Sequence, residues 1–365
     1  MKTIAFYLPQ FHPIPENDKW WGKGFTEWHN VRKAKSLFKG HRQPQVPGEL
    51  GYYDLRNDET RHKQAELAQK YGIDAFCYYH YWFNGKQLLE TPITQMLADS
   101  DCNMPFCLCW ANENWSRAWD GKDREIMMEQ TYSLEDHQAH SEHLCKIFTD
   151  RRYLKSEGKP VFIIYRIGKI PDAERFIHIL NEAAIKAGFN GVRVFAVRYP
   201  SCNISDETLA TWGINDIVDF EPNAKDIPRN SIIGKAFRLG QRAWNSFAKK
   251  WKGPEFYSIL KIDYKSVVQK ALRLYESQND RHYPTVFPNW DNSPRRKAAV
   301  IIQNDSPDDF AQWVHSAADI LRKRPEEDQF LFINAWNEWA EGAHLEPDQE
   351  MGRSFLEAFK KGIEP

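Results

Sequence analysis

The chain has 365 residues, with 49 basic and 50 acidic side chains and a formal charge of −1. This balance argues against a nucleic acid or an anionic membrane surface as the main partner. Hydrophobic residues make up 42% of the chain and charged residues 27%, which is typical of a folded globular protein and excludes a disordered one. The length fits either two small domains or one large α/β barrel.

The sequence contains no segment that predicts membrane insertion or secretion. No run approaches the roughly 18 apolar residues of a membrane span. The stretch from Met1 to Pro9 is too short for the apolar core of a signal peptide and has no small-residue cleavage site. Cysteines occur without a C-x-x-C pair, mostly inside apolar runs, at Cys77, Cys102, Cys107, Cys109, Cys145 and Cys202. We therefore expect a cytoplasmic protein with buried, reduced thiols.

Apolar strand-like runs alternate with helical patterns along the whole chain. The predicted strands are Thr3–Pro9, Gly72–Trp82, Pro105–Trp110, Pro160–Arg166, Val192–Tyr199, Ile217–Glu221, Thr285–Pro288 and Gln329–Ala335. The predicted helices are Glu59–Tyr71, Leu88–Asp99, Glu135–Arg151, Asp172–Ala187, Ser205–Trp212, Ser266–Gln278, Pro307–Lys323 and Arg353–Lys361. Eight strands and eight helices in alternation predict a (β/α)8 TIM barrel, in the α/β class.

The strands are apolar on both faces, which fits a barrel or a doubly wound sheet. A doubly wound nucleotide-binding sheet usually carries a glycine-rich phosphate loop, and neither G-x-G-x-x-G nor G-x-x-x-x-G-K-[ST] is present. We therefore expect one barrel domain over residues 1–365. Two long insertions follow the first and sixth strands, at about residues 10–58 and 223–264, and the second contains a basic amphipathic piece around Lys235–Lys252. Barrel insertions at these ends of the strands shape substrate sites.

Aromatic, carboxylate and amide side chains follow nearly every predicted strand. In a barrel these positions share one rim, where active sites are built. Indole rings stack on the C–H faces of sugars, and carboxylates and amides bind hydroxyl groups. The 14 tryptophans of the chain therefore predict a carbohydrate site, although any single one could equally be part of the core.

Glu338 and Glu341 form the most specific pattern, because they directly follow the last apolar strand and are flanked by Trp336 and Trp339. A spacing of three residues brings two side chains together in a helical turn. Neighbouring carboxylates push their proton affinities apart, so that one remains an acid while the other is ionised. This is the minimum equipment for cleaving a glycosidic bond, and we predict that both residues are catalytic. The alternative is an ordinary solvated helix face.

We assign sugar recognition to further residues of the rim. Glu27 and Glu113 each have a tryptophan within two residues and suit hydroxyl binding, although a structural role is the alternative. The predicted substrate-binding residues are Tyr7, His12, Glu27, Trp28, Tyr79, His80, Trp110, Glu113, Trp115, Arg166, Tyr199, Glu221, Trp290, Asp291, Trp336 and Asn337.

Two patterns resemble metal sites, and we interpret neither as one. His12, His80 and His344 match no standard metal-ligand spacing, so we expect no metal and no cofactor. Asp99-Ser100-Asp101 resembles the D-x-D with which many glycosyltransferases hold the metal ion of a nucleotide sugar. It lies before the third strand, at the opposite rim, and we interpret it as the end of a helix.

Four motifs resemble the WbsX-type proteins, which are related to glycoside hydrolase family 99, the endo-α-mannosidases and endo-α-mannanases. The motifs are residues 6–13 (FYLPQFHP), 24–28 (GFTEW), 110–115 (WANENW) and 336–342 (WNEWAEG), and the resemblance covers nearly the whole chain. It implies a (β/α)8 barrel and no metal. The terminal motif of family 99 reads Asn-Glu-Trp-His-Glu, so Glu338 and Glu341 fall on its two catalytic carboxylates, while Ala340 replaces its histidine.

By this resemblance, Glu338 would act as a base on the sugar 2-hydroxyl, which attacks the anomeric carbon and forms a 1,2-anhydro sugar. Glu341 would protonate the leaving oxygen and then activate water, giving net retention. A base that works on a 2-hydroxyl suits manno-configured sugars. The resemblance thus implies an enzyme that cleaves or transglycosylates an α-linked oligo- or polysaccharide.

Two rival functions remain. WbsX-type proteins are often labelled glycosyltransferases and are often encoded among genes for O-antigen and other surface polysaccharides. A transferase would need a nucleotide site, and the absence of a phosphate-binding glycine loop argues against it. A catalytically silent glycan-binding module would keep the tryptophans but does not need two carboxylates three residues apart.

Overall fold

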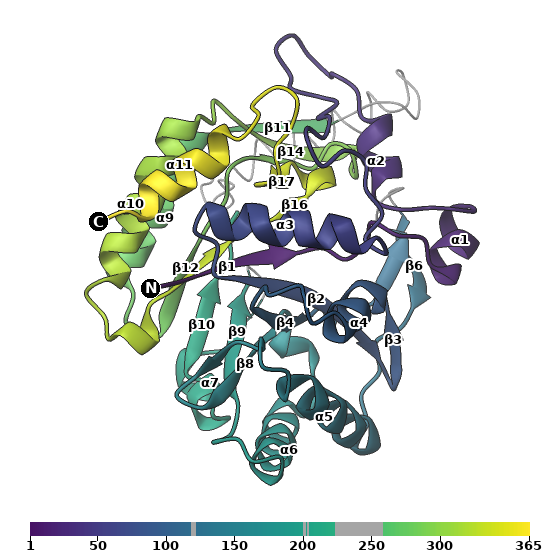
Figure 1. The fold of residues 1–365 in the computed structure, drawn as a ribbon, viewed down its shortest axis with the longest axis vertical. Helices are drawn as coiled ribbons and strands as arrows, with labels where there is room; N and C mark the ends of the chain where they lie inside the picture. The colour runs from purple at the N-terminus through teal and green to yellow at the C-terminus, as the bar shows by residue number, and fades with distance from the viewer. Residues whose placement is uncertain (118–121, 200–201, 203, 223–257) are drawn as a thin grey trace, which may run out of the picture.

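The computed structural model describes residues 1–117, 122–199, 202, 204–222 and 258–365. Eight parallel strands close into a barrel because β1 pairs with both β2 and β15 (Figure 1). The barrel strands are β1 (Lys2–Tyr7), β2 (Ala75–Phe83), β4 (Phe106–Trp110), β8 (Lys159–Ile164), β9 (Arg193–Arg198), β10 (Asp216–Asp219), β12 (His282–Val286) and β15 (Phe330–Ile333). Each overlaps a predicted strand, and the (β/α)8 barrel is confirmed. Strands such as β4 are buried at every residue, which explains their unbroken apolar sequence.

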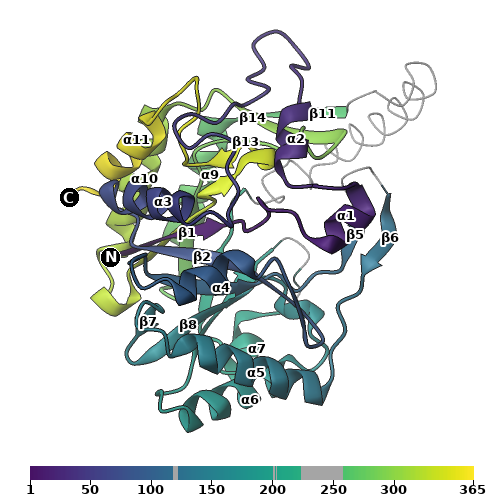
Figure 2. The same cartoon turned by 45° about the vertical axis from the view of Figure 1, so that its right-hand side comes forward.

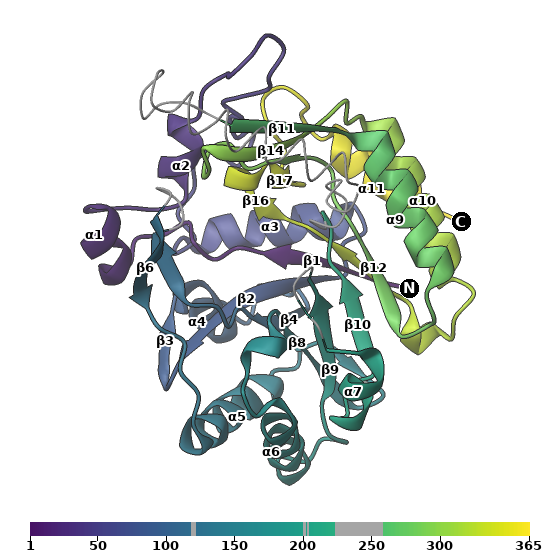
Figure 3. The same cartoon turned by 180° about the vertical axis from the view of Figure 1, so that it is seen from behind.

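Eight helices follow the strands in the predicted order. They are α3 (Asp58–Lys70), α4 (Thr91–Ala98), α5 (Leu134–Phe148), α6 (Ala173–Lys186), α7 (Asp206–Thr211), α9 (Tyr264–Ser277), α10 (Pro307–Leu321) and α11 (Ser354–Ile363). Several begin at a side-chain cap, as where Ser133 accepts a hydrogen bond from the backbone of Asp136. Seen from behind, α9 and α10 lie side by side next to β12 (Figure 3). No helix of the described residues is long and apolar enough to cross a membrane.

The predicted start of the second helix at Leu88 is wrong. Leu88 pairs with Tyr81 across an antiparallel hairpin between the end of β2 and β3 (Lys86–Leu88). The helix α4 begins at Thr91, and Pro92 occupies its first turn, where the missing N–H costs nothing. The other short elements are β5 (Trp115–Arg117), β6 (Lys122–Met128), β7 (Lys155–Ser156), η2 (Ile167–Lys169) and η3 (Glu326–Asp328).

The insertions build the upper part of the barrel. The first contains α1 (Pro15–Trp21) and α2 (Trp28–Lys33), and α1 lies beside the β5–β6 hairpin (Figure 2), where Trp20 packs edge-on against Trp115. Most of the second insertion, including the basic piece around residues 235–252, lies outside the described residues. A third insertion, which the sequence did not indicate, follows β12. It forms β13 (Trp290–Asp291) and β14 (Ala298–Gln303), which join β11 (Ser258–Asp263) in a separate three-stranded sheet.

The interior of the barrel is filled by apolar and aromatic side chains. Phe6 of β1 packs on Tyr79, Phe220 and Phe332 from three other parts of the barrel wall. All six cysteines are free thiols, and all but Cys202 are buried, as the sequence predicts. This packing makes the barrel interior a solid core and places any cavity above it, at the carboxyl ends of the strands.

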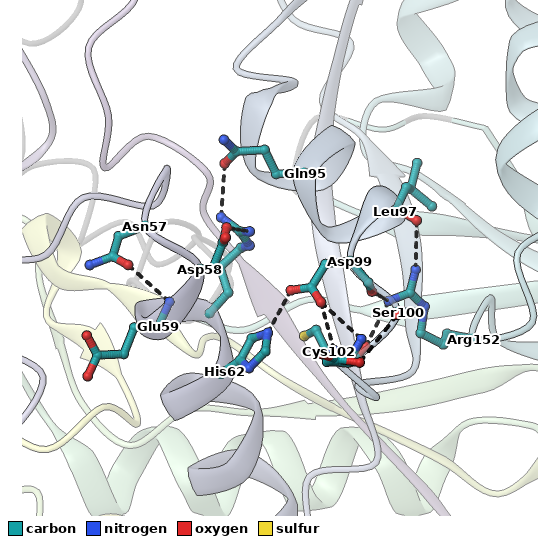
Figure 4. A network of polar contacts seen from close by, with 12 residues as sticks. Asn57, Asp58, Glu59, His62, Gln95, Leu97, Asp99, Ser100, Cys102 and Arg152 are labelled. Carbon is teal, nitrogen blue, oxygen red and sulfur yellow. Dashed lines mark hydrogen bonds and ion pairs between the residues drawn. The ribbon is translucent and has the colours of Figure 1, made fainter.

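The Asp99-Ser100-Asp101 sequence ends α4, as predicted, and takes part in a network of polar contacts with α3 and Arg152 (Figure 4). Asp99 accepts hydrogen bonds from the backbone of Asp101, and its other oxygen lies 2.6 Å from Nε2 of His62 on α3. Arg152 donates to the carbonyl oxygens of Asp99 and Cys102 at 2.7 and 2.8 Å. These contacts fasten two helices and the following loop together, which accounts for the motif structurally.

Candidate active site

Glu338 and Glu341 lie on one tight turn above the last barrel strand. The turn consists of β16 (Asn337–Glu338), the 3-10 helix η4 (Trp339–Glu341) and β17 (Ala343–His344), with β16 and β17 paired as a hairpin. Residues three apart stand above one another in a 3-10 helix, so the two carboxylates leave the turn on the same side. Gly342 closes it with φ +68°, and a Cβ there would lie 2.8 Å from the backbone nitrogen of Asp291. Only glycine fits at this position.

One guanidinium binds three carboxylates in the site. Arg295 places Nε 2.9 Å from Oε1 of Glu27, Nη2 2.9 Å from Oε2 of Glu338 and Nη1 2.9 Å from Oε1 of Glu341. We call these four residues the Arg295 cluster. Arg295 is buried, and its planar fork fixes the directions of all three partners. Asn30 also donates to Oε1 of Glu27, so the cluster is anchored on α2 as well.

The Arg295 cluster is suited to holding a proton. Burial raises the pKa of Glu338 to about 8, and the charges of Glu341 and Glu27 add to this effect, although Arg295 opposes it. With all three carboxylates ionised, one guanidinium would face three negative charges in a water-poor site. Retaining a proton on Glu338 relieves this repulsion. The side chain of Glu341 is 23% exposed and that of Glu338 only 8%, so Glu341 is the more accessible of the two.

A cavity of about 530 Å³ opens above the pair. Its aromatic walls come from the strand ends and the first insertion, and its polar groups are carboxylates, amides and guanidinium groups. The predicted site residues that line it are Tyr79, Glu113, Trp115, Arg166, Tyr199, Trp290, Glu338 and Glu341. Arg166 lies over the rings of Tyr165 and Tyr199, and its Nε is 2.9 Å from Oε1 of Glu113. These stacked and paired groups give one wall a fixed geometry.

Three predicted substrate-binding residues point away from this cavity because side chains alternate along a strand. Tyr7 faces α3 and donates to Gln64 at 2.7 Å. His80 faces α5, where its Nε2 lies 3.0 Å from Nε2 of His140, and burial lowers the pKa of His80 to about 3. Trp110 packs on His140 and Phe176. The neighbours Tyr79 and Tyr81 face the cavity instead.

Four further predicted residues lie behind the turn that carries Glu338 and Glu341 and support it. Trp28 donates to the carbonyl oxygen of Tyr53 at 2.8 Å, and Glu27 is fully buried in the Arg295 cluster. Trp336 is fully buried and packs on Phe76. Asn337 accepts from the backbone nitrogen of Leu8 at 2.7 Å and donates to its carbonyl oxygen, which fastens the turn to the end of β1.

The remaining three predicted residues also lie outside the cavity wall. His12 is buried in the first insertion, and this burial lowers its pKa to about 4. Glu221 is buried, and its carbonyl oxygen accepts from Asn334. Asp291 accepts from Gln43 at 2.7 Å and lies 2.8 Å from Nε2 of His41, so it holds the first insertion against β13.

The family model described as Glycosyltransferase WbsX matches residues 3–359. The chain therefore belongs to the WbsX family. This confirms the predicted resemblance. Two curated relatives, each described as uncharacterized protein WxcX and found in two strains of Xanthomonas campestris pv. campestris, are 38% identical over 370 residues. The match covers 99% of this chain and 49% of each relative, so the chain spans about half the length of the curated relatives it matches.

Solved structures share the fold of this WbsX-family chain. A glycoside hydrolase-like protein aligns with a TM-score of 0.59 at 12% identity, covering 100% of this chain and 94% of that one. The GH99 endo-alpha-mannosidase from Bacteroides thetaiotaomicron aligns with a TM-score of 0.57 at 12% identity, covering 98% and 95%. At this identity the likeness establishes the barrel fold.

Sequence reasoning missed Arg295, the residue that links the carboxylates of this WbsX-family chain. Arg295 lies in the third insertion, four residues after Asp291. It is therefore too far beyond the seventh predicted strand to count as a strand-end residue. The only available signal was a pair of arginines after Pro294 in a loop beyond the seventh strand. Other cavity residues absent from the predicted set include Gln10, Asn17, Trp21, Tyr81, Asn114, Tyr165, Arg198, Phe220, Asn292, Arg296 and Asn334.

A second buried carboxylate supports the turn from below. Glu346 accepts hydrogen bonds from Trp339, Gln64 and Tyr53 at 2.6, 2.6 and 2.8 Å. Burial raises its pKa to about 7, although these hydrogen bonds lower it in part. Trp339 is also stacked on His344, with ring centroids 3.7 Å apart. The tryptophan between the two catalytic candidates is thus fixed on two sides.

We expect the free energy of unfolding to fall as pH rises from 5 to 8. Glu346 binds a proton in the folded state up to about pH 7, whereas its unfolded pKa is near 4.5, so raising the pH favours the unfolded chain. Glu346→Gln should reduce this fall by on the order of 3 kcal/mol. Urea denaturation at several pH values measures it, with the exposed Glu357→Gln on α11 as control. An unchanged pH dependence in Glu346→Gln would show that this carboxyl is ionised in the folded protein.

Proposed function

We propose that this chain is a carbohydrate-active enzyme that cleaves or transglycosylates an α-linked, manno-configured glycan with retention of configuration. The observation that carries the proposal is the binding of Glu338 and Glu341 to one guanidinium at the floor of a cavity with aromatic walls. A pair of carboxylates that shares a proton supplies an acid and a base at the same point.

The cavity suits a sugar. Tyr79, Trp115 and Trp290 provide ring faces, and a pyranose presents C–H groups that pack on such faces. Glu113, Asn114 and Asn292 provide oxygen and nitrogen atoms for hydroxyl groups. A volume of about 530 Å³ lies within the range of small-molecule sites.

In the proposed reaction, the carboxylate of Glu338 takes the proton of the sugar 2-hydroxyl. The freed oxygen attacks the anomeric carbon and forms a 1,2-anhydro sugar, while Glu341 gives its proton to the departing glycosidic oxygen. Glu341 then takes a proton from water, whose oxygen opens the anhydro ring at the anomeric carbon, and Glu338 returns its proton to the 2-oxygen. Two inversions give retention. An acceptor hydroxyl in place of water gives transglycosylation.

The electrostatics of the pair suit these roles. A carboxylate whose pKa is raised is a stronger base, which helps Glu338 to act on a weakly acidic hydroxyl. The proposed reaction requires the form of the pair in which Glu338 is ionised and Glu341 carries the proton. Because the pair needs one proton, we expect kcat/KM to fall as pH rises above about 8.

The rival function is sugar transfer from a nucleotide donor, which the family name suggests. A donor diphosphate would need free cationic groups. In the cavity, Arg295 is bound to the carboxylates of its cluster, Arg166 pairs with Glu113 and Arg198 pairs with Asp206, which leaves Arg296 as the arginine without an ion pair to a described residue. These pairs reduce the positive charge open to a phosphate and favour hydroxyl groups.

The test is to incubate the protein with a panel of α-linked bacterial polysaccharides and α-mannans, with and without nucleotide sugars, and to follow anomeric protons by NMR. New reducing ends of initially retained configuration, formed without nucleotide, are the expected result. Transfer that occurs only with a nucleotide donor, with release of the nucleotide, would establish a transferase and make this cavity an acceptor site.

A further inference from the structure

A second cavity of about 210 Å³ lies beside the active site. One side is the first insertion around His41, Arg42 and Gln45, and the other is the separate sheet, with Gln303 and Asp305 at the end of β14. These lining residues all belong to the described part of the chain. Its volume is that of roughly seven waters, which is enough for a single sugar ring.

The second cavity adjoins the catalytic turn. Trp290 is a lining residue of both cavities, so the two cavities adjoin at β13. Asn289 and Asp291 line the second cavity and also lie against Gly342, the residue that follows Glu341. A glycan bound over Glu338 and Glu341 that extends past Trp290 therefore reaches the second cavity.

The lining of the second cavity is suited to hydroxyl groups. Gln45, Asn289, Gln303 and Asn304 contribute amide groups. Amide groups of this kind both donate to and accept from the hydroxyl groups of a sugar.

The charges of the second cavity disfavour a phosphate. Among the described residues that line it, the carboxylates are Asp291 and Asp305, and the arginine, Arg42, is ion-paired with Asp305. His41 faces Asp291 at 2.8 Å. Two carboxylates beside a paired arginine repel a diphosphate but accept hydrogen bonds from neutral sugars.

We infer that the second cavity is a binding subsite for a neutral sugar residue of the same glycan, one ring beyond Trp290. This inference rests on the proposed function and adds to it. A glycan that occupies both cavities extends past Glu338 and Glu341, so its length sets its affinity. Short oligosaccharides fill the main cavity alone, and longer ones gain the contacts of the second.

The test uses Gln303, which lines the second cavity and contacts neither catalytic carboxylate. Gln303→Trp fills the cavity and Gln303→Ala removes an amide, and Gln138→Trp on the exposed face of α5 is the matched control. Each is made in a Glu341→Gln background so that ligands remain intact. Titration calorimetry measures the binding of α-linked manno-oligosaccharides of two to six residues, and of GDP-mannose as the phosphate probe.

We expect Gln303→Trp to weaken binding of the longest oligosaccharides by about tenfold or more, the size of one or two lost hydrogen bonds, and to leave disaccharide binding unchanged. Gln303→Ala should give a smaller loss, and Gln138→Trp none. Equal affinities for every length in parent and Gln303 variants would overturn the subsite while leaving the proposed function in place. GDP-mannose binding that Gln303→Trp alone removes would also overturn it. Failure of the parent to bind any oligosaccharide would count against both.

Discussion

Glu341→Gln should remove turnover and leave the fold and glycan binding intact. Glutamine has nearly the shape of glutamate and still reaches Nη1 of Arg295 with its carbonyl oxygen, but it has no proton to give to a leaving oxygen. We expect kcat to fall by about 10³-fold or more, within the upper range for a lost acid–base group. Initial rates of reducing-end formation measure kcat, and calorimetry measures retained binding.

The matched control is Glu113→Gln, because Glu113 lines the same cavity but lies outside the Arg295 cluster. It should change KM more than kcat, as expected for a group that binds substrate and transition state alike. A Glu341→Gln variant that is as active as the parent would place the chemistry on other residues.

Arg295→Met should cause losses of both stability and activity. The substitution leaves Glu27, Glu338 and Glu341 together without their shared cation in a buried site. Removing one partner of a buried ion pair costs about 3–5 kcal/mol. We therefore expect the free energy of unfolding, measured with urea, to fall by about that amount.

Arg295→Lys distinguishes the role of Arg295 in orienting the carboxylates from its role in stabilising the fold. The lysine ammonium group keeps the positive charge, but it cannot bind three carboxylates at once as the planar guanidinium does. Its activity should fall by roughly 10²-fold with a smaller loss of stability. Arg295 lowers the pKa of Glu338, so the alkaline limb of kcat/KM should move to higher pH in this variant. The exposed Arg296→Lys is the control. An unchanged limb in Arg295→Lys would show that Arg295 only holds the fold.

The order of strands and helices could be predicted because most barrel strands are buried on both faces and therefore contain a run of apolar residues. Phe330 to Ile333 shows this clearly. The short elements could not be predicted in this way. Leu88 ends a three-residue hairpin strand, and β13 has two residues, so their pairing depends on tertiary contacts and leaves no periodic signal.

The proximity of Glu338 and Glu341 and part of the cavity lining could be predicted. Glu338 and Glu341 are close in sequence, so their spacing predicts their proximity. Arg295 is some forty residues away in a loop, and nothing local indicates that it meets them. His80 and Trp110 lie at strand ends as predicted, but the two-residue alternation turns them toward α5 and α6. Because successive side chains of a strand point to opposite faces, the even spacing from Tyr79 identifies the residues that face the cavity, and His80 is not among them.

The Arg295 cluster joins Glu27, near the start of the chain, to carboxylates more than three hundred residues later. Closure of the barrel joins segments that are similarly far apart in the sequence, because β1 pairs with β15. During synthesis on the ribosome, β1 emerges first and stays unpaired with β15 until that strand has been made. A nascent chain therefore cannot assemble the Arg295 cluster until the region of residue 341 has been made.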